Sequence, residues 1–366
     1  MKILYVLDFE PFCEDKDGLT KIYYNLIKYI SKNNYVDLLI VLEDKIDNVD
    51  NFYNVKSIFY ETIKLSKFEK NINRIKYEYA TTLSKNKVKN LYDKYNMKQY
   101  NIIHTAHLFF SNISFYHSSI VIGATDASSL AMSENTPREK LRKFYYKKIE
   151  DVLSKKDLWI HTVTQRDYDR YKTDKKFIIT NGVDSEKYRS YNVDKIKKSF
   201  VFHGNLDYKV NKDAIFYMSK VLKDIGCKYK LYIVGRGESE SYAFLDNVVV
   251  VGEVDNIAKE ISKYEYYLIL MTAGTGVKNK LLEAMSCECN IIANNLAING
   301  LEDIEYLKHS INFIDGGDEI KNIILNKVDK NARDYILKNY AWESFANQFI
   351  TKYEKIWESS LLVGKK

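Results

Sequence analysis

The segment Gly274-Thr275-Gly276-Val277-Lys278-Asn279-Lys280-Leu281-Leu282-Glu283-Ala284-Met285 decides how the second half of this chain folds. It follows an apolar run over residues 266–271, typical of a buried strand, and continues as a helix-like pattern. A second apolar run follows at residues 290–293. Two glycines and two lysines therefore lie where a strand ends and a helix begins. That is the ligand-binding position of an open α/β sheet.

The chemistry of this segment suits a nucleotide diphosphate. Free backbone N–H groups and the helix dipole attract an anion, and lysines add positive charge. We expect the amides of Gly276 and Val277 to meet a diphosphate, and Lys278 or Lys280 to neutralise it. Glu283 lies two turns into the helix and is expected to accept hydrogen bonds from ribose hydroxyls. The alternative is an ordinary strand–turn–helix joint, which the lysines and the following Glu-Ala-Met argue against.

Four further motifs accompany this segment in a fixed order. They are Asn181-Gly182-Val183-Asp184, Phe202-His203-Gly204-Asn205-Leu206-Asp207-Tyr208, Leu231-Tyr232-Ile233-Val234-Gly235-Arg236-Gly237 and Val249-Val250-Val251-Gly252-Glu253-Val254. Together with residues 274–285 they resemble the retaining glycosyltransferases of family 4, which have the GT-B fold. The branch that is most similar reads Gly-x-x-Asn-Lys-x-Leu-Glu-Ala-Met and contains sugar transferases of bacterial surface and exported polysaccharide systems. The first 180 residues match only loosely.

The fold implied by the resemblance is α/β, with two doubly wound Rossmann-like domains facing across a cleft. We expect an acceptor-side domain at residues 1–190, a nucleotide-sugar domain at 198–340, and a last helix at 341–360 that crosses back to the first domain. Strands alternating with helices independently argue for parallel sheets. The expected strands cover residues 3–7, 36–42, 102–105, 120–123, 158–163, 200–203, 231–234, 248–251, 267–271, 290–293 and 312–314. A helix is expected at 19–31, helical structure across 63–98, a linker at 186–198, and an amphipathic segment at 342–357.

The resemblance also implies which residues of the second domain line the donor pocket. Besides Thr275, Gly276, Val277, Lys278, Lys280 and Glu283, these are Gly204, Asn205, Lys209, Gly235, Arg236, Glu253 and Val254. Plain turns remain an alternative for residues 235–237 and 253–254.

Three positions depart from the family pattern. Asn205 and Val210 stand where the family commonly has Arg and Lys on the donor phosphates, and Thr275 stands where many members have a glutamate. A cation must meet the charge on the leaving nucleotide, so we expect Lys209 to act with Lys278 or Lys280. A solvated loop lysine is the alternative for Lys209.

In the first domain, two segments resemble family loops that face the donor and acceptor. Gly18 lies at the start of an expected helix, where N–H groups can approach an anion. Asp126 follows an expected strand, and we predict that it faces the reacting sugar, where it orients the acceptor or stabilises positive charge on the ring. Helix N-capping is the alternative for both segments. The nearby histidines, His104, His107 and His117, are not singled out as a base.

The composition is that of a globular protein of two ordinary domains, with 366 residues, 46% hydrophobic and 29% charged. No apolar run approaches the ~20 residues of a spanning helix, and the first residues predict a strand rather than a signal peptide. We therefore expect a cytoplasmic location. The four cysteines and six histidines lack metal spacing, so we predict free thiols, no metal site and no cofactor.

The net charge of +7 is unevenly spread. Residues 61–100 carry ten Lys/Arg against four Asp/Glu, interleaved with tyrosines and leucines. Such a surface could lie on an anionic membrane at its inner face or hold an anionic acceptor. A solvated helix face is the alternative, and nucleic acid is not expected because no recognised module accompanies the charge.

These observations favour a retaining glycosyltransferase that moves a sugar from a nucleotide-diphosphate donor, such as a UDP-sugar or GDP-sugar, to a hydroxyl of a glycan or lipid-linked acceptor. The resemblance implies a front-face mechanism, in agreement with the lack of a paired-carboxylate signature. A same-fold nucleotide-sugar epimerase and a non-catalytic subunit that binds glycan or protein remain open. A nicotinamide dehydrogenase is disfavoured, because Gly-x-Gly-x-x-Gly does not follow the first strand.

Overall fold

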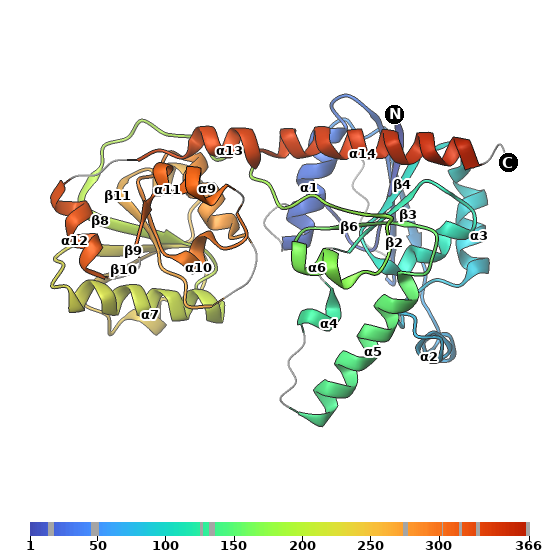
Figure 1. Cartoon of the computed structure of the whole chain (residues 1–366), viewed down its shortest axis with the longest axis horizontal. Helices are drawn as coiled ribbons and strands as arrows, with labels where there is room; N and C mark the ends of the chain where they lie inside the picture. Colours follow the sequence, from blue (N-terminus) through green and yellow to red (C-terminus); the bar gives the residue numbers. More distant parts are fainter. Residues whose placement is uncertain are drawn as a thin grey trace. The chain divides into compact units, whose positions relative to one another are not determined.

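The computed structural model describes residues 1–13, 18–44, 51–124, 127–131, 136–273, 277–301, 303–314, 317–326 and 330–363. The chain divides into two compact units (Figure 1). Unit 1 comprises Met1–Thr180 and Phe345–Lys366, and unit 2 comprises Asn181–Ser344. Each unit is a parallel sheet with helices, which confirms the predicted α/β class. The segment expected as a linker, residues 186–198, belongs to unit 2.

The described strands of unit 1 form one seven-stranded sheet in the order β3-β2-β1-β4-β5-β6-β7, and every pairing is parallel. Its strands are β1 (Lys2–Leu7), β2 (Tyr35–Leu42), β3 (Ser57–Thr62), β4 (Ile102–Thr105), β5 (Ile120–Gly123), β6 (Trp159–Thr162) and β7 (Lys176–Ile178). The sequence analysis missed β3 and β7. Both are edge strands that are incompletely buried, and their apolar runs, Ile58-Phe59-Tyr60 and Phe177-Ile178, are short.

The helices of unit 1 are α1 (Gly18–Ile30), α2 (Lys67–Ile75), α3 (Lys85–Lys94), α4 (Ser128–Ala131), α5 (Pro137–Leu153) and α6 (Gln165–Arg170). The basic stretch 63–98 thus holds two helices separated by a turn. Capping boxes define where α2 and α5 begin, because Ser66 pairs with Glu69 and Thr136 pairs with Glu139. Pro137 follows Thr136 in the first turn of α5, where its missing N–H costs nothing.

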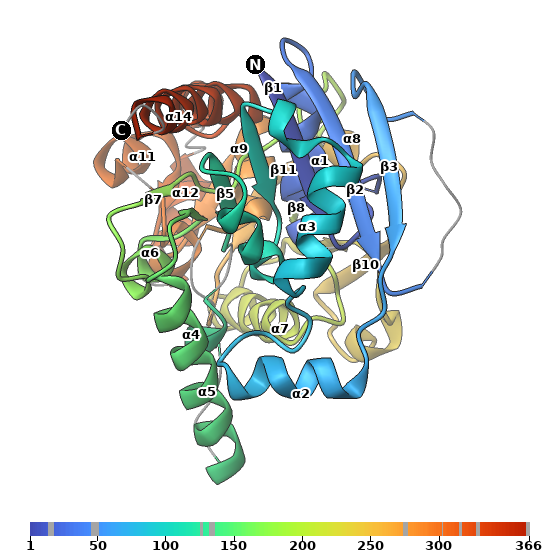
Figure 2. The same ribbon diagram turned by 90° about the vertical axis from the view of Figure 1, so that its right-hand side faces the viewer.

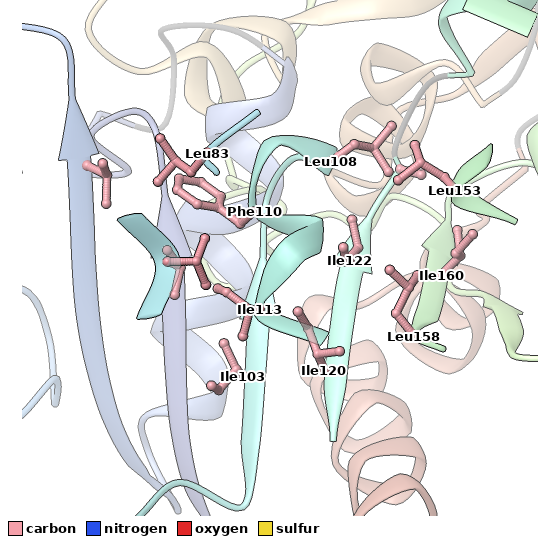
Figure 3. Packing of buried hydrophobic residues seen from close by; sticks show 14 of the residues in the cluster. Leu83, Ile103, Leu108, Phe110, Ile113, Ile120, Ile122, Leu153, Leu158 and Ile160 are labelled. Atoms are coloured by element: carbon pink, nitrogen blue, oxygen red, sulfur yellow. The ribbon is translucent and has the colours of Figure 1, made fainter. Parts of the chain in front are cut away.

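A hydrophobic cluster covers one face of the unit 1 sheet (Figure 3). Alternate residues of neighbouring strands contribute to it, among them Ile103 of β4, Ile120 and Ile122 of β5 and Ile160 of β6. This period of two places their side chains on the same face. Leu153 of α5 packs into the cluster, so the end of α5 is anchored in the core (Figure 3).

The opposite face of this sheet is covered by α1 and by α14 (Trp342–Val363). Tyr353 of α14 bonds His104 of β4, and its hydroxyl lies 3.3 Å from that of Tyr5. Phe349 stacks edge-on against His161 at 4.7 Å between ring centroids. The part of α14 from Phe345 onward is therefore an integral layer of unit 1.

The described strands of unit 2 form a six-stranded parallel sheet in the order β10-β9-β8-β11-β12-β13. They are β8 (Ile196–His203), β9 (Lys230–Val234), β10 (Val248–Gly252), β11 (Tyr264–Ile269), β12 (Ile291–Ala293) and β13 (Asn312–Phe313). All six were expected from the sequence, with differences at their ends. Its helices are α7 (Lys209–Asp224), α8 (Ile257–Ile261), α9 (Asn279–Ser286), α10 (Asn295–Ile298), α11 (Ile304–Ser310), α12 (Gly317–Asn326) and α13 (Arg333–Asn339).

Within the described ranges, no helix combines the length and apolar character needed to cross a membrane.

Candidate functional site

The candidate site lies at the carboxyl edge of the unit 2 sheet, where the strand order reverses. From β8 the chain adds β9 and β10 on one side, and later β11, β12 and β13 on the other. Loops that leave adjacent strands in opposite directions create a crevice at such a point. His203 ends β8, and the residues after β11 lead into α9, so both elements flank this crevice.

A buried chain of hydrogen bonds links these two elements. Nε2 of His203 lies 2.7 Å from Oε2 of Glu283 on α9, and Nδ1 of His203 lies 2.9 Å from the hydroxyl of Tyr267 on β11. A carboxylate only accepts, so in the neutral imidazole Nε2 donates to Glu283 and Nδ1 accepts from Tyr267. Burial raises the pKa of the Tyr267 hydroxyl, which keeps it protonated as this donor. The carboxylate of Glu283 is thereby fixed in one orientation.

Lys280 supplies a cation one turn before Glu283. Its Nζ donates to Oδ1 of Asn211 at 2.8 Å and lies 5.4 Å from the centroid of the Phe202 ring. The pKa of Lys280 is lowered to about 8, chiefly by burial; the charge of Glu283 opposes this shift and that of Lys278 adds to it. An ammonium whose charge is destabilised by burial gains from an anionic ligand, which would restore the favourable environment that water provided.

Lys278 is the N-cap residue of α9 and is buried, and burial lowers the pKa of its ammonium as well. Two lysines therefore stand with the N–H groups of the first turn of α9. Like charges held close together at a helix N-terminus favour an anion between or beside them. Val277, just before Lys278, is half-buried.

The glycine loops after β8 and β9 fit against each other. The N–H of Gly204 donates to the carbonyl of Val234 at 2.9 Å, and that of Leu206 donates to the carbonyl of Arg236 at 2.8 Å. Gly235 has φ +137°, and a Cβ there would lie 2.0 Å from the carbonyl oxygen of Gly204. Only glycine allows the two backbones to approach this closely.

The structure brings some of the predicted donor residues together and leaves others apart. Lys280 and Glu283 meet β8, and Gly204 lies against both Asn211 and Lys280. The backbone carbonyl of Asn205 accepts from Asn211 at 2.7 Å, so the loop and Lys280 are tied to the same amide. Asn211 therefore positions the Lys280 ammonium beside this loop.

Other predicted donor residues are not brought to this group. The Lys209 side chain is 84% exposed and pairs with Asp213 at 2.9 Å, one turn along α7. Arg236 is exposed, and its backbone carbonyl accepts from the N–H of Leu206. Glu253 and Val254 follow the edge strand β10, and β9 lies between β10 and β8. Thr275 and Gly276, predicted at the phosphate turn, lie outside the described residues.

In unit 1, Gly18 begins α1 as expected for its position in the sequence, and Asp126 lies outside the described residues. A pair that the sequence analysis missed occupies the equivalent reversal point of the unit 1 sheet, between β1 and β4. Oδ1 of Asp8 lies 2.5 Å from Nδ1 of His107. In the sequence, Asp8 and His107 each lie just after an expected strand. That these two strands are neighbours in the sheet becomes known only from the strand order.

The Asp8–His107 pair is partly exposed and has an aromatic side. The carboxylate orients the imidazole through Nδ1, so Nε2 is left as the acceptor in the neutral form. Phe109 lies 5.0 Å from the His107 ring, between centroids. A hollow beside the pair is lined mainly by apolar side chains; its lining residues are Asp8, Val41, Leu42, Glu43, Ile63, Leu65, Thr81, Leu83, Phe109 and Phe110. Such a site suits a hydroxyl-bearing ligand with an apolar part.

Among the described residues, no group of three or more His, Cys, Asp or Glu side chains could hold a metal ion.

Comparisons with known proteins identify a family domain in unit 2 and the fold of the chain. Residues 197–315 match the family model described as "Glycosyl transferases group 1", which spans the sheet and α9 of unit 2. No curated protein sequence matches the chain. The match to the family therefore rests on the unit that contains Lys280 and Glu283.

Solved structures share the fold over nearly the whole chain. HepE of Anabaena, solved in complex with UDP, has 12% identity and a TM-score of 0.64, with 97% of this chain and 100% of that chain covered. A glycosyltransferase from Rickettsia africae has 10% identity and a TM-score of 0.65, covering 97% and 98%. The lipopolysaccharide outer core galactosyltransferase WaaB, in its apo form, has 13% identity and a TM-score of 0.60, covering 97% and 100%. At these identities the likeness establishes the fold.

Proposed function

Since the chain has the GT-B fold and residues 197–315 match the group 1 glycosyltransferase model, we propose that it is a retaining glycosyltransferase. It would move a sugar from a nucleotide-diphosphate donor to a hydroxyl of a glycan or lipid-linked acceptor in bacterial surface polysaccharide or glycoconjugate synthesis. The observation that carries the proposal is the placement of Lys280 and the His203-held Glu283 together at the reversal point of the unit 2 sheet.

In this proposal the donor's diphosphate lies at the N-terminus of α9. The ammonium groups of Lys278 and Lys280 neutralise it, and the amides of Gly276 and Val277 donate to its oxygens. The hydroxyls of the ribose donate to the carboxylate of Glu283. HepE was solved with UDP and UDP-glucose, which makes uridine nucleotides the first probes to use.

The departures from the family pattern fit a variant arrangement of the same charges. Asn205 and Val210 cannot neutralise phosphate, but Asn211 holds the Lys280 ammonium beside the loop that contains Asn205. We propose that Lys280 carries the compensating charge for the leaving nucleotide, and that Thr275 contributes a hydroxyl or its backbone where many family members use a glutamate. A preorganised cation that meets charge as it develops lowers the barrier most.

The acceptor is proposed to bind to unit 1. Nε2 of His107, oriented by Asp8, would accept a hydrogen bond from the acceptor hydroxyl, and Asp126 would face the reacting sugar. In a front-face reaction, the bond from the anomeric carbon to the diphosphate breaks while the acceptor oxygen bonds on the same face. The acceptor proton passes to the leaving phosphate oxygen. His107 then orients the hydroxyl and is not required to keep the proton.

The test begins with a thermal-shift screen of the full chain against UDP-, GDP- and dTDP-sugars. A ligand that binds the native state raises the melting temperature. The best donor is then incubated with glycan and lipid-linked acceptors, and free nucleotide and the anomeric configuration of the product are measured. We expect one donor class to stabilise the protein and to yield a product with the donor's configuration. A product with inverted configuration would contradict the retaining assignment.

The exposed position of Lys209 and the substitutions Asn205 and Val210 favour one alternative, a binding subunit without turnover. That protein would be stabilised by a nucleotide sugar but would release no nucleotide with any acceptor. An epimerase would instead convert the donor sugar with no acceptor present.

A further inference from the structure

Unit 1 has a basic and apolar surface that neither candidate site uses. Residues 67–78, from α2 and the turn after it, and residues 136–148, from the first three turns of α5, form this α2–α5 surface. We propose that it docks the protein on an anionic lipid bilayer. The proposal rests on the proposed function only in that a lipid-linked acceptor would be presented there.

Four large apolar side chains of this surface stand in solvent. Phe68 and Ile75 of α2 are 73% and 79% exposed, and Leu141 and Phe144 of α5 are 69% and 52% exposed. Phe68 and Ile75 are two turns apart and share one face of α2, and Leu141 and Phe144 are neighbours on α5. Exposed apolar side chains gathered in this way mark a surface that binds a partner or a membrane.

The same two segments are strongly basic. Ten lysines and arginines stand against three glutamates, a net of +7, which equals the formal net charge of the whole chain. The basic residues are Lys67, Lys70, Arg74, Lys76, Arg138, Lys140, Arg142, Lys143, Lys147 and Lys148. Positive charge interspersed with apolar side chains is complementary to a bilayer whose headgroups are anionic and whose interior is apolar.

The three glutamates, whose charge the net of +7 already includes, each take part in local structure. Glu69 caps α2 through Ser66 and pairs with Lys87 of α3 at 2.8 Å. Glu139 caps α5 through Thr136, and Glu78 lies 3.4 Å from Lys156.

The two helices form a single surface. The ring of Tyr77, just after α2, lies 6.0 Å from that of Tyr145 on α5, and the Tyr145 hydroxyl donates to the carbonyl of Glu78 at 2.9 Å. Arg74, Leu141 and Phe144 line a shared groove between them. In Figure 2, α2 and the first turns of α5 lie at the same end of unit 1, which is the end toward which β2 and β3 run.

The α2–α5 surface differs from residues 61–100, the basic stretch that the sequence analysis suggested for contact with a membrane or an anionic acceptor. The lysines of α3 have acidic partners: Lys87 pairs with Glu69, Lys89 with Asp93 at 2.7 Å, and Lys94 with Glu61. Such pairs remove charge that would otherwise act on a membrane. On the α2–α5 surface Lys70 pairs with Glu43 at 2.8 Å, but basic residues still outnumber acidic ones. This surface also carries the exposed apolar side chains, so the docking surface centres on α5 rather than on α3.

A row of aromatic rings connects this surface with the proposed acceptor site. Centroid distances are 5.0 Å from His107 to Phe109, 5.4 Å from Phe109 to Tyr79, and 5.7 Å from Tyr79 to Tyr146 of α5. A bilayer held at α5 would thus lie beside the site in which His107 meets the acceptor hydroxyl. This arrangement favours a lipid-linked acceptor over a free glycan.

The experiment is co-sedimentation of the full chain with vesicles of phosphatidylcholine alone or mixed with phosphatidylglycerol. We expect binding to the mixed vesicles only, weakening as salt rises because exposed charges are screened. The double variant Leu141→Glu/Phe144→Glu should lower binding at least tenfold, as should Arg138→Glu/Arg142→Glu. The matched controls in unit 2, Phe244→Glu/Leu325→Glu and Lys220→Glu/Lys228→Glu, should bind as the wild type does.

Circular dichroism and melting temperature verify that each variant folds. No binding of the wild type to anionic vesicles would overturn the proposal, as would equal losses in the unit 2 controls. A dimer that forms with rising protein concentration and disappears in the α5 variants, without vesicle binding, would assign the surface to a second copy of the chain and also overturn the proposal.

UDP affinity should be the same in every α5 variant. Vesicle binding without UDP affinity would refute the proposed function and leave the docking surface standing. UDP affinity without vesicle binding would refute the docking surface and leave the proposed function standing.

Discussion

Nε2 of His203 lies 2.7 Å from Oε2 of Glu283, and both side chains are buried at the carboxyl edge of the unit 2 sheet. His203 comes from β8 and Glu283 from α9, so the contact joins the two elements on either side of the reversal point. It fixes the carboxylate that we propose to bind the donor ribose. The interaction also makes His203 a positioning residue, although it does not itself need to touch the donor.

Replacing His203 tests this relationship. We expect His203→Phe to weaken UDP binding about tenfold or more and to lower stability by about 1–3 kcal/mol, because a bond to a buried carboxylate is lost. His203→Gln keeps an N–H donor and should recover part of both. Calorimetric titration and denaturant unfolding measure the two effects. If His203→Phe binds UDP as tightly as the wild type, Glu283 does not depend on this contact.

The lowered pKa of Lys280 predicts how donor binding changes with pH. Burial sets this pKa at about 8, below the ordinary 10.5, so the ligand-free protein loses this positive charge as pH rises through 8. The dissociation constant for UDP should then rise with pH, by up to about tenfold for each unit. Lys280→Met should bind weakly at every pH and lose this dependence. A matched Lys209→Met variant should keep the wild-type profile.

The same pKa gives the sign of a stability effect. Between pH 8 and 10.5 the unfolded chain binds more protons at Lys280 than the native chain, so stability of the free protein rises with pH in this window. At neutral pH the charged ammonium is buried at a cost. We therefore expect Lys280→Met to melt at or above the wild-type temperature, and a much lower melting temperature would mean that Lys280 is chiefly structural.

The close approach of two loops predicts a large effect of a small substitution. In Gly235→Ala the new Cβ would lie 2.0 Å from the Gly204 carbonyl oxygen at a φ of +137°. Backbone strain alone costs about 1–3 kcal/mol, and relieving the overlap must move the loop. We expect lower stability together with loss of UDP binding. Gly226→Ala is the control, since a Cβ there meets nothing within 4 Å and only its φ of +63° is strained, at about 1–2 kcal/mol.

The Asp8–His107 pair predicts a separation of donor and acceptor effects. His107→Phe removes Nε2, so the rate with a working acceptor should fall at least tenfold while UDP affinity is unchanged. Asp8→Asn leaves the ring but weakens its orientation, and should lower the rate less. A His107→Phe enzyme with normal turnover would remove His107 from the acceptor site.

The sequence predicts the fold well where apolar runs are long and buried. Every strand of unit 2 was expected, because apolar residues recur in each between recognisable turns, including the edge strand β10, a run of four valines that is only partly buried. The missed strands, β3 and β7, are half-exposed edges whose pairing depends on neighbours. The helix α5 was also missed, since its first half is exposed and its buried hydrophobic residues, Ile149 and Leu153, lie near its end.

The candidate site is predictable to the extent that it is local in sequence. Lys278, Lys280 and Glu283 belong to one segment, and spacing alone places them at a helix start. His203, Asn211 and Tyr267 come from elements far apart in the chain, so their roles became visible only with the strand order. Lys209 illustrates the converse, because its charge suggested phosphate but its place on α7 directs it to Asp213 and solvent.

The most direct test of the central claim is calorimetric titration of UDP into the wild type, Lys280→Ala, Glu283→Gln and the exposed-lysine control Lys209→Ala. The proposed donor site predicts that Lys280→Ala and Glu283→Gln each bind UDP at least tenfold more weakly while remaining folded, and that Lys209→Ala stays within about threefold of the wild type. Wild-type affinity in both Lys280→Ala and Glu283→Gln would contradict it.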